Sequence, residues 1–313
     1  MTTARKLALG AALAGAAALL PPLLPKWALF LGTLSVAKGL VVLGLLLLMR
    51  TGLVSFGQGL YYATGAYAAG LAASALHLTD AVPMILVGAL AAAATAAVLG
   101  LLLARYRTIF FAMLSLAFSM ILYGLLVKTP ALGSTDGFNV SARTVLGFAA
   151  GDGVGRYGVF VAAAVLACAG ALLLDAFLRS RLGRLSPAVR DNELRVEYMG
   201  ASARNVVHLN LVLAAALSGA GGAVTALTVG HIDPEMAYWT TSGEFVFIAI
   251  LSGTGSVAAP FVGAVALELL KSYAYEHAPN TWQLVVGSAM LAVILFLPEG
   301  LWSLFRRRRR AVA

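Results

Sequence analysis

Long runs of apolar residues, separated by short polar or charged stretches, make up most of the chain. A transmembrane helix needs about 20 predominantly apolar residues, and the runs reach or approach that length. We therefore predict an all-α, polytopic membrane protein with about ten transmembrane helices. The predicted crossings are 7–24, 28–49, 53–76, 81–104, 108–127, 158–178, 207–229, 236–252, 258–274 and 282–304.

The amino-acid composition agrees with this pattern and limits the disulfide and metal sites that the chain could form. Hydrophobic residues make up 61% of the chain and charged residues 11%, whereas a soluble domain has about 25% charged residues. We therefore treat 1–313 as a single transmembrane domain. One cysteine, Cys168, excludes an internal disulfide framework, and the four histidines are scattered without ligand spacing. No metal site is expected.

The distribution of basic residues decides between nine and ten crossings. Gly253 and Gly255 lie in a polar turn that separates the eighth crossing from the ninth, because paired glycines break a helix. Ten crossings place both termini and the arginine-rich loop 179–206 in the cytoplasm, as the positive-inside rule requires. The tail 306–310 is then an anchor at the lipid headgroups rather than a nucleic-acid site. Residues 1–24 also fit a cleavable signal peptide, so both their retention and their removal stay open.

Two loops are long enough to have structure of their own. The outer loop, 128–157, contains Gly133, Asp136 and Gly137, which suit either a tight turn over a binding cavity or an ordinary polar loop. In the cytoplasmic loop, 179–206, Ser186 and Pro187 predict a helix start, and Gly200 predicts its end.

The predicted helix 187–199 carries Val189, Val196 and Met199 towards one face and charged residues on the rest. A short two-faced helix between membrane crossings suits docking of a cytoplasmic partner. A solvated surface helix or one lying in the lipid headgroups fits the same pattern.

Charged residues inside the predicted crossings raise the free energy of membrane insertion, so each is expected to have a structural or functional role. Lys38 lies twelve residues from both Lys26 and Arg50, about 18 Å at helical rise, so it is expected to face the bundle interior or a wet cavity. Four further charged residues are closer to the crossing ends and are expected to reach water. They are Asp175, Glu244, Glu268 and Lys271.

Two crossings have an unusual residue content. The third begins with three glycines, Gln58 and three tyrosines, which suits either the lining of a transport pathway or close helix packing. The seventh has small residues at every fourth position, which predicts close approach of another helix. These are Ala214, Ser218, Gly222 and Ala226.

Motifs for nucleotide binding and catalysis are missing. The chain contains no Gly-Lys pair and therefore no phosphate-loop ATP site. The stretch 253–258 fits a dinucleotide glycine pattern, but its flanks are membrane segments instead of alternating strands and helices. Without a nucleophile elbow or paired catalytic carboxylates, the chain is not expected to be an enzyme.

Several motifs together resemble one family, the permease subunits of branched-chain amino-acid type ABC importers, which includes urea and short-chain amide permeases. They run in family order across about 50–300. They are Gly52 to Gln58, Gly65 to Tyr67, Phe111 to Phe118, Gly133 to Gly137, Ala188 to Glu193 with Met199-Gly200, Ser218 to Gly222, Trp239 to Glu244, Gly253 to Ser256 and Leu297 to Leu301.

The resemblance implies an importer subunit in a bacterial inner membrane. It would form a heterodimer with a second permease and assemble with two cytoplasmic ATPase subunits and an extracytoplasmic solute-binding protein. No cofactor would be bound directly, and ATP would bind the partner ATPase subunits. The helix 187–199 would couple the ATPase to transport through Arg190, Asn192, Glu193 and Gly200. Ser55, Gln58, Tyr61 and Ser115 are candidates for the substrate path.

The expected function is thus translocation of a branched-chain or related amino acid by alternating access. A permease for urea or short-chain amides is an alternative within the same family. An ion-coupled secondary transporter is an alternative outside it, and a membrane-embedded enzyme is a third.

Overall fold

Helices account for most of the chain in the computed structural model, which describes residues 25–140, 144–145, 148–149, 154–297 and 300–304. The predicted first crossing, 7–24, and the arginine tail, 306–310, lie outside the described residues. The helices of the first half are α2 (Lys26–Arg50), α3 (Gln58–Ala75), α4 (Ala81–Leu103), α5 (Thr108–Lys128) and α6 (Val154–Arg179).

In the second half, two short helices, α7 (Arg181–Asp191) and α8 (Glu193–Tyr198), precede the long helix α9 (Ala203–Val229). The chain then forms α10 (Trp239–Ser252), α11 (Ala259–His277) and α12 (Trp282–Phe296). Nine described helices thus match nine of the ten predicted crossings. Five of them, α2, α4, α5, α6 and α9, are long and apolar enough to span a membrane by themselves.

Helix α9 is the centre of the bundle and packs against α2, α3 and α4. Small residues permit this, as the stripe in the sequence predicts. A Cβ atom at Gly44 of α2 would lie 2.6 Å from the Ala214 carbonyl oxygen, and one at Gly88 of α4 would lie 2.6 Å from the Gly65 carbonyl oxygen. Helices α2, α3, α4 and α9 therefore meet backbone to backbone.

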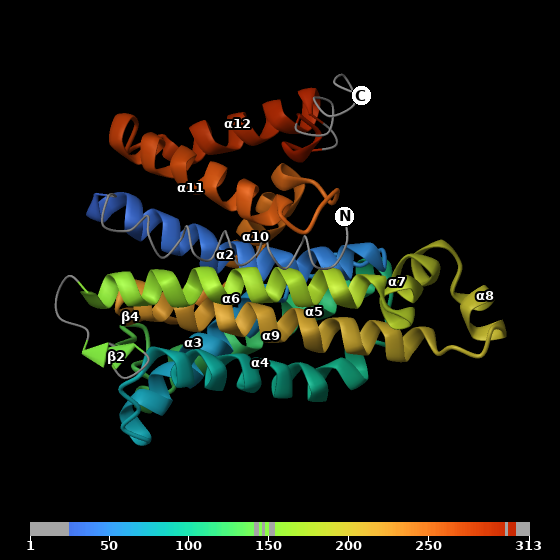
Figure 1. Cartoon of the computed structure of the whole chain (residues 1–313), viewed down its shortest axis with the longest axis horizontal. Coiled ribbons are helices and arrows are strands. Elements are labelled where there is room, and N and C mark those ends of the chain that lie inside the picture. The colour runs from blue at the N-terminus through green and yellow to red at the C-terminus, as the bar shows by residue number, and fades with distance from the viewer. Residues whose placement is uncertain (1–24, 141–143, 146–147, 150–153, 298–299, 305–313) are drawn as a thin grey trace.

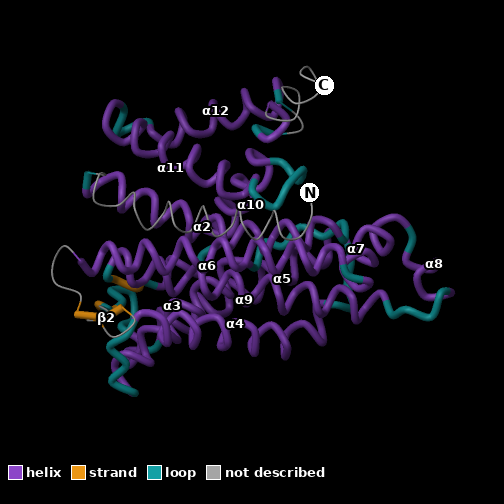
Figure 2. Tube along the Cα trace, in the orientation of Figure 1, coloured by secondary structure: helices purple, strands orange, loops and turns teal. Residues whose placement is uncertain are grey.

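The arrangement in space has two distinct ends (Figures 1 and 2). Helices α2, α4, α6 and α9 run along the long axis, and α7 and α8 extend beyond the bundle at one end. Short strands lie at the other end. Helices α11 and α12 lie on the side of α2 that faces away from α9.

The strand end is built from the predicted outer loop and from the segment that follows α9. Strand β1 (Phe138–Asn139) pairs antiparallel with β4 (His231–Ile232), and β2 (Thr144–Val145) pairs with β3 (Phe148–Ala149). Gly133 and Gly137 have φ of 87° and 66°, and the Gly137 amide donates to the Gly133 carbonyl oxygen at 3.0 Å. Residues 133–137 therefore form a tight turn, and a binding cavity beneath it stays a prediction.

Several crossings differ from the prediction in their boundaries, and the tenth ends as helix α12 at Phe296 instead of at 304. Helix α3 begins at Gln58, and residues 51–57 are irregular, with Gly52 at a φ of 78°. The eighth and ninth crossings are separate helices, as predicted, and Gly253 at φ 78° ends α10. Helix α11 extends to His277, beyond the predicted end at 274, which places Glu268 at the middle of the helix.

Candidate coupling site and membrane path

The loop between α6 and α9 forms two helices where the sequence predicted one. Helix α7 begins after Ser180, whose hydroxyl accepts from the Gly183 amide at 3.2 Å. The predicted start at Ser186 and Pro187 is wrong, because both residues lie inside α7. The Ser186 hydroxyl is fully buried and accepts instead from Asn210 Nδ2 of α9, at 2.8 Å.

Helix α8 presents opposite faces to the bundle and to the surroundings. Val189 of α7 and Val196 of α8 are 2% and 1% exposed and pack in one apolar cluster with residues of α2, α5 and α9. Met199 does not share their face, contrary to the prediction. It is exposed, as are Leu194 and Tyr198, the latter by 89%. This end of the molecule therefore carries an apolar surface made of Leu194, Tyr198 and Met199.

The four predicted coupling residues have different local roles. Asn192 separates the two helices, and its side-chain oxygen accepts from the Arg195 amide at 2.9 Å, which caps α8. Glu193 forms an ion pair with Arg107 in the α4–α5 connection. Arg190 is exposed and its stem lies against Gly52. Gly200, at φ 81°, ends the segment.

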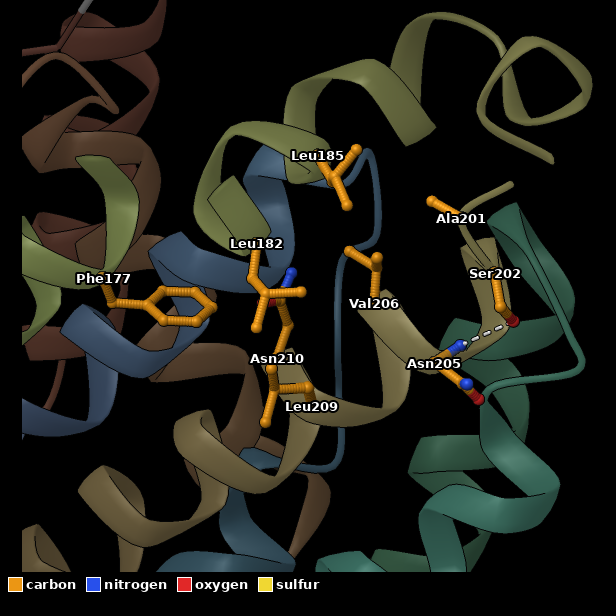
Figure 3. A pocket seen from close by; sticks show the side chains of 9 residues that line it. All are labelled: Phe177, Leu182, Leu185, Ala201, Ser202, Asn205, Val206, Leu209 and Asn210. Carbon is orange, nitrogen blue, oxygen red and sulfur yellow. Dashed lines mark hydrogen bonds between the residues drawn. The ribbon is translucent and has the colours of Figure 1, made fainter. Parts of the chain in front are cut away.

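A cavity of about 390 Å³ lies between α7 and the start of α9 (Figure 3). Its walls are mainly apolar, and the Asn205 amide donates to the Ser202 hydroxyl at its edge, at 3.3 Å. The lining residues are Phe177, Leu182, Leu185, Ala201, Ser202, Asn205, Val206, Leu209 and Asn210. Beside this cavity, α7 and α9 remain joined by the buried hydrogen bond from Asn210 to Ser186.

The predicted path residues gather at the start of α3. The Ser115 hydroxyl of α5 accepts from the Phe56 amide, and the Ser55 hydroxyl accepts from the Gly57 amide, each at 3.2 Å. These bonds satisfy donors that the irregular segment 51–57 would otherwise leave free. Ser55, Ser115 and Tyr61 are at most 3% exposed, so they pack inside the bundle in this conformation.

Gln58 joins α3 to α9. Its Oε1 accepts from the Ser218 hydroxyl at 2.6 Å, and its fully buried Nε2 has no hydrogen-bond partner in the described part of the chain. One residue further on, the Gly59 amide donates to the Ser242 hydroxyl of α10 at 2.9 Å. Polar groups of three helices therefore meet at the start of α3.

Lys38 lies inside the bundle, as predicted, and has two ionic partners. Its Nζ is 2.6 Å from Glu244 Oε1 of α10 and 2.6 Å from Glu268 Oε1 of α11. Lys271 Nζ is 2.7 Å from Glu244 Oε2. We call these four residues the charge network; it joins α2, α10 and α11 and carries no net charge.

The expectation of contact with water is wrong for Glu268, whose side chain is 8% exposed and pairs with Lys38. The side chains of Glu244 and Lys271 are 20% and 18% exposed, and they pair with each other. Asp175, by contrast, lies near the end of α6 and pairs with Arg179 at 3.0 Å. The available signal was the balance of two lysines and two glutamates within apolar segments, which predicts mutual pairing but not which helices meet.

No group of three or more His, Cys, Asp and Glu side chains in the described ranges is arranged to hold a metal ion. The candidate site therefore consists of the α7–α8 segment, the buried polar contacts at the start of α3 and the charge network.

Comparison with known proteins identifies the family. The family described as "Branched-chain amino acid transport system / permease component" matches residues 28–295, which extends from α2 to α12. The chain belongs to this family. It is accordingly a polytopic, helical membrane protein of the permease type, and the family is one of transport subunits rather than enzymes.

Curated members of the permease family are similar over most of the chain. The high-affinity branched-chain amino acid transport system permease protein LivM of Escherichia coli is 25% identical over 85% of this chain and 66% of the relative. LivM of Salmonella typhimurium is 26% identical over the same shares. BraD of Pseudomonas aeruginosa is 27% identical over 39% of this chain and 40% of its own length.

The chain thus spans slightly less than two thirds of the length of the two LivM relatives. No solved structure matches it significantly. The α7–α8 segment and the charge network lie within the matched residues 28–295.

Proposed function

We propose that this permease is a membrane-spanning subunit of an ATP-driven importer that translocates branched-chain or related amino acids by alternating access. The family match over residues 28–295 carries the proposal, and the LivM relatives support the solute class. The complex would contain a second permease, two cytoplasmic ATPase subunits and an extracytoplasmic solute-binding protein. It would lie in a bacterial inner membrane with both termini in the cytoplasm.

The apolar surface of Leu194, Tyr198 and Met199 supports a docking role for α8. Exposed apolar side chains that project beyond the bundle favour binding of another protein. Asn192 caps α8 and Glu193 ties it to Arg107, so a movement of a bound ATPase would reach α4 and α5 through this contact. ATP would then be bound and hydrolysed outside this chain.

The double variant Leu194→Ser, Tyr198→Ser is expected to lower ATP-dependent uptake at least about tenfold. Both side chains would become buried when the ATPase docks, and large buried side chains contribute most of the binding free energy of an interface. The measurement is uptake of labelled leucine by vesicles that contain the permease with its partner subunits, together with ATP hydrolysis. Glu197→Gln, an exposed change on the same helix, is the control and leaves uptake unaltered.

Substitution is a sharper test than deletion of 187–200. A deletion would also remove Val189 and Val196, which are buried, so a loss of uptake would follow from lost packing as well. Unchanged uptake in a correctly inserted double variant would contradict the coupling role of α8.

One observation favours a second candidate, an ion-coupled secondary transporter. Such proteins bury ionisable residues along an ion route, and the charge network places four such residues within the bundle. Leucine uptake by the purified chain in ATP-free liposomes, driven by a proton or sodium gradient, would support this candidate. ATP-dependent uptake with no response to the gradient would exclude it.

A further inference from the structure

The charge network is a chain of alternating signs. Along it the order is Glu268, Lys38, Glu244, Lys271, and each neighbouring pair is 2.6 to 2.7 Å apart. The two inner residues, Lys38 and Glu244, each have an ionic partner on both sides. Their charges are therefore compensated within the network.

The charges of the two outer residues, Glu268 and Lys271, are each compensated by a single ionic partner. Glu268 has an ion pair with Lys38, and Lys271 has one with Glu244; neither has a second ionic partner in the part of the chain that the structure describes. Both residues belong to α11 and are three positions apart, which places them on one side of the helix with Cβ atoms about 5–6 Å apart. A carboxylate and an ammonium group thus stand next to each other, each able to take one more partner.

The position of the charge network in the bundle indicates a function for these two adjacent charges. Lys38 is at the middle of α2, about 18 Å from either end at helical rise. Ionised groups at this depth face a bundle interior or a water-lined cavity and mark the routes of polar solutes. The side chains of Lys38, Glu244 and Lys271 are 15%, 20% and 18% exposed, and that of Glu268 is 8% exposed. Lys271 is therefore within reach of a ligand in this conformation, and Glu268 would become accessible as the bundle opens in alternating access.

We propose that Glu268 and Lys271 form a binding site for the charged groups of a zwitterion, with the ammonium group of the solute on Glu268 and its carboxylate on Lys271. This inference rests on the proposed transport of amino acids and assigns residues to it. In an α-amino acid the two charged groups are attached to one carbon, which matches two opposite charges one helical turn apart. Urea and simple amides carry neither charge and would leave both residues without a second partner.

Binding to the full-length chain in lipid nanodiscs tests the site. The probe is radiolabelled leucine, with leucinamide, which lacks the carboxylate, and 4-methylpentanoate, which lacks the ammonium group, as competitors. The wild type is expected to bind leucine at least about tenfold more tightly than either competitor, because each loses one charged hydrogen-bonding pair. Urea is expected not to compete.

Two substitutions separate the charged ends. Lys271→Met is expected to weaken leucine binding about tenfold or more and to leave leucinamide binding unaltered. Glu268→Gln is expected to weaken leucine and leucinamide binding and to spare 4-methylpentanoate. Asp175→Asn and Arg179→Gln remove an ion pair at the end of α6; they are the matched controls and leave all three affinities unaltered.

If Glu268 and Lys271 served only to stabilise the fold, their substitution would change the three ligand affinities in a different pattern. The double variant Glu268→Gln, Lys271→Met keeps the Lys38–Glu244 pair and the neutrality of the network, and it is expected to fold and to lose leucine binding. Equal loss of all three ligands in Lys271→Met, or no saturable leucine binding by the wild type, would overturn the site. ATP-dependent leucine uptake by the wild-type complex tests the proposed function separately, so the two failures are distinguishable.

Discussion

Replacing Lys38 by methionine is expected to cost about 3–5 kcal/mol of stability and to remove most of the folded protein. The substitution leaves Glu268 without its ionic partner inside the bundle, and an uncompensated buried charge is strongly destabilising. The measurement is the yield of monodisperse protein in mild detergent and its unfolding midpoint. The double variant Lys38→Met, Glu268→Gln leaves the Glu244–Lys271 pair, so it is expected to recover much of the loss.

This pair of variants isolates charge from packing. Both remove the lysine side chain, and they differ in whether Glu268 keeps its charge. If the double variant were as unstable as Lys38→Met, the destabilisation would come from the missing lysine stem instead of from the unpaired carboxylate.

Substituting Gly222 by alanine is expected to destabilise the bundle by about 1–3 kcal/mol or more, as overpacking of a tight contact does. A Cβ atom at Gly222 of α9 would collide with the Tyr62 carbonyl oxygen of α3. Backbone cannot rotate away as a side chain can, so the two helices must separate. Thermal unfolding of the purified protein measures the effect.

Gly287 provides the matched control. It also lies within a helix, α12, but among the described residues a Cβ atom there would have no atom of another helix within 4 Å. Gly287→Ala is therefore expected to be neutral or to stabilise by about 0.5–1 kcal/mol, because alanine favours a helix over glycine. Equal destabilisation by both substitutions would contradict the close contact of α9 with α3.

Hydrophobic patterning predicted most of the fold because each membrane helix is specified by its own sequence. The runs that became α2, α4, α5 and α9 are long and apolar, and their ends carry signals such as Asp80, which caps α4, and Gly230, which ends α9. The small-residue stripe also predicted close packing correctly, since only small side chains let helix backbones approach.

Prediction failed where the outcome depends on contacts between distant segments. Ser186 has the residue type of a cap, but a buried partner, Asn210, draws its hydroxyl into α7, and Ser180 caps the helix instead. The extent of α11 decided the position of Glu268, and its pairing with Lys38 depends on how three helices meet. No local pattern contains that information.

The assignment of Ser55, Gln58, Tyr61 and Ser115 to a substrate path stays a prediction. Ser55, Gln58 and Ser115 do meet at the start of α3, because the irregular segment 51–57 runs beside α5. The sequence suggested a lining of a pathway or a packed contact, and in this conformation the side chains are buried.

The backbone contacts around α9 have a consequence for movement. Helices held at such short separation cannot slide or rotate past one another without collision, so α2, α3, α4 and α9 must shift as one rigid unit. Any opening of the molecule therefore requires hinges at the edge of that unit. Helix α10 is joined to it by apolar side chains such as Phe245 and by hydroxyl and ionic contacts, which can break and form again more readily than contacts between backbones.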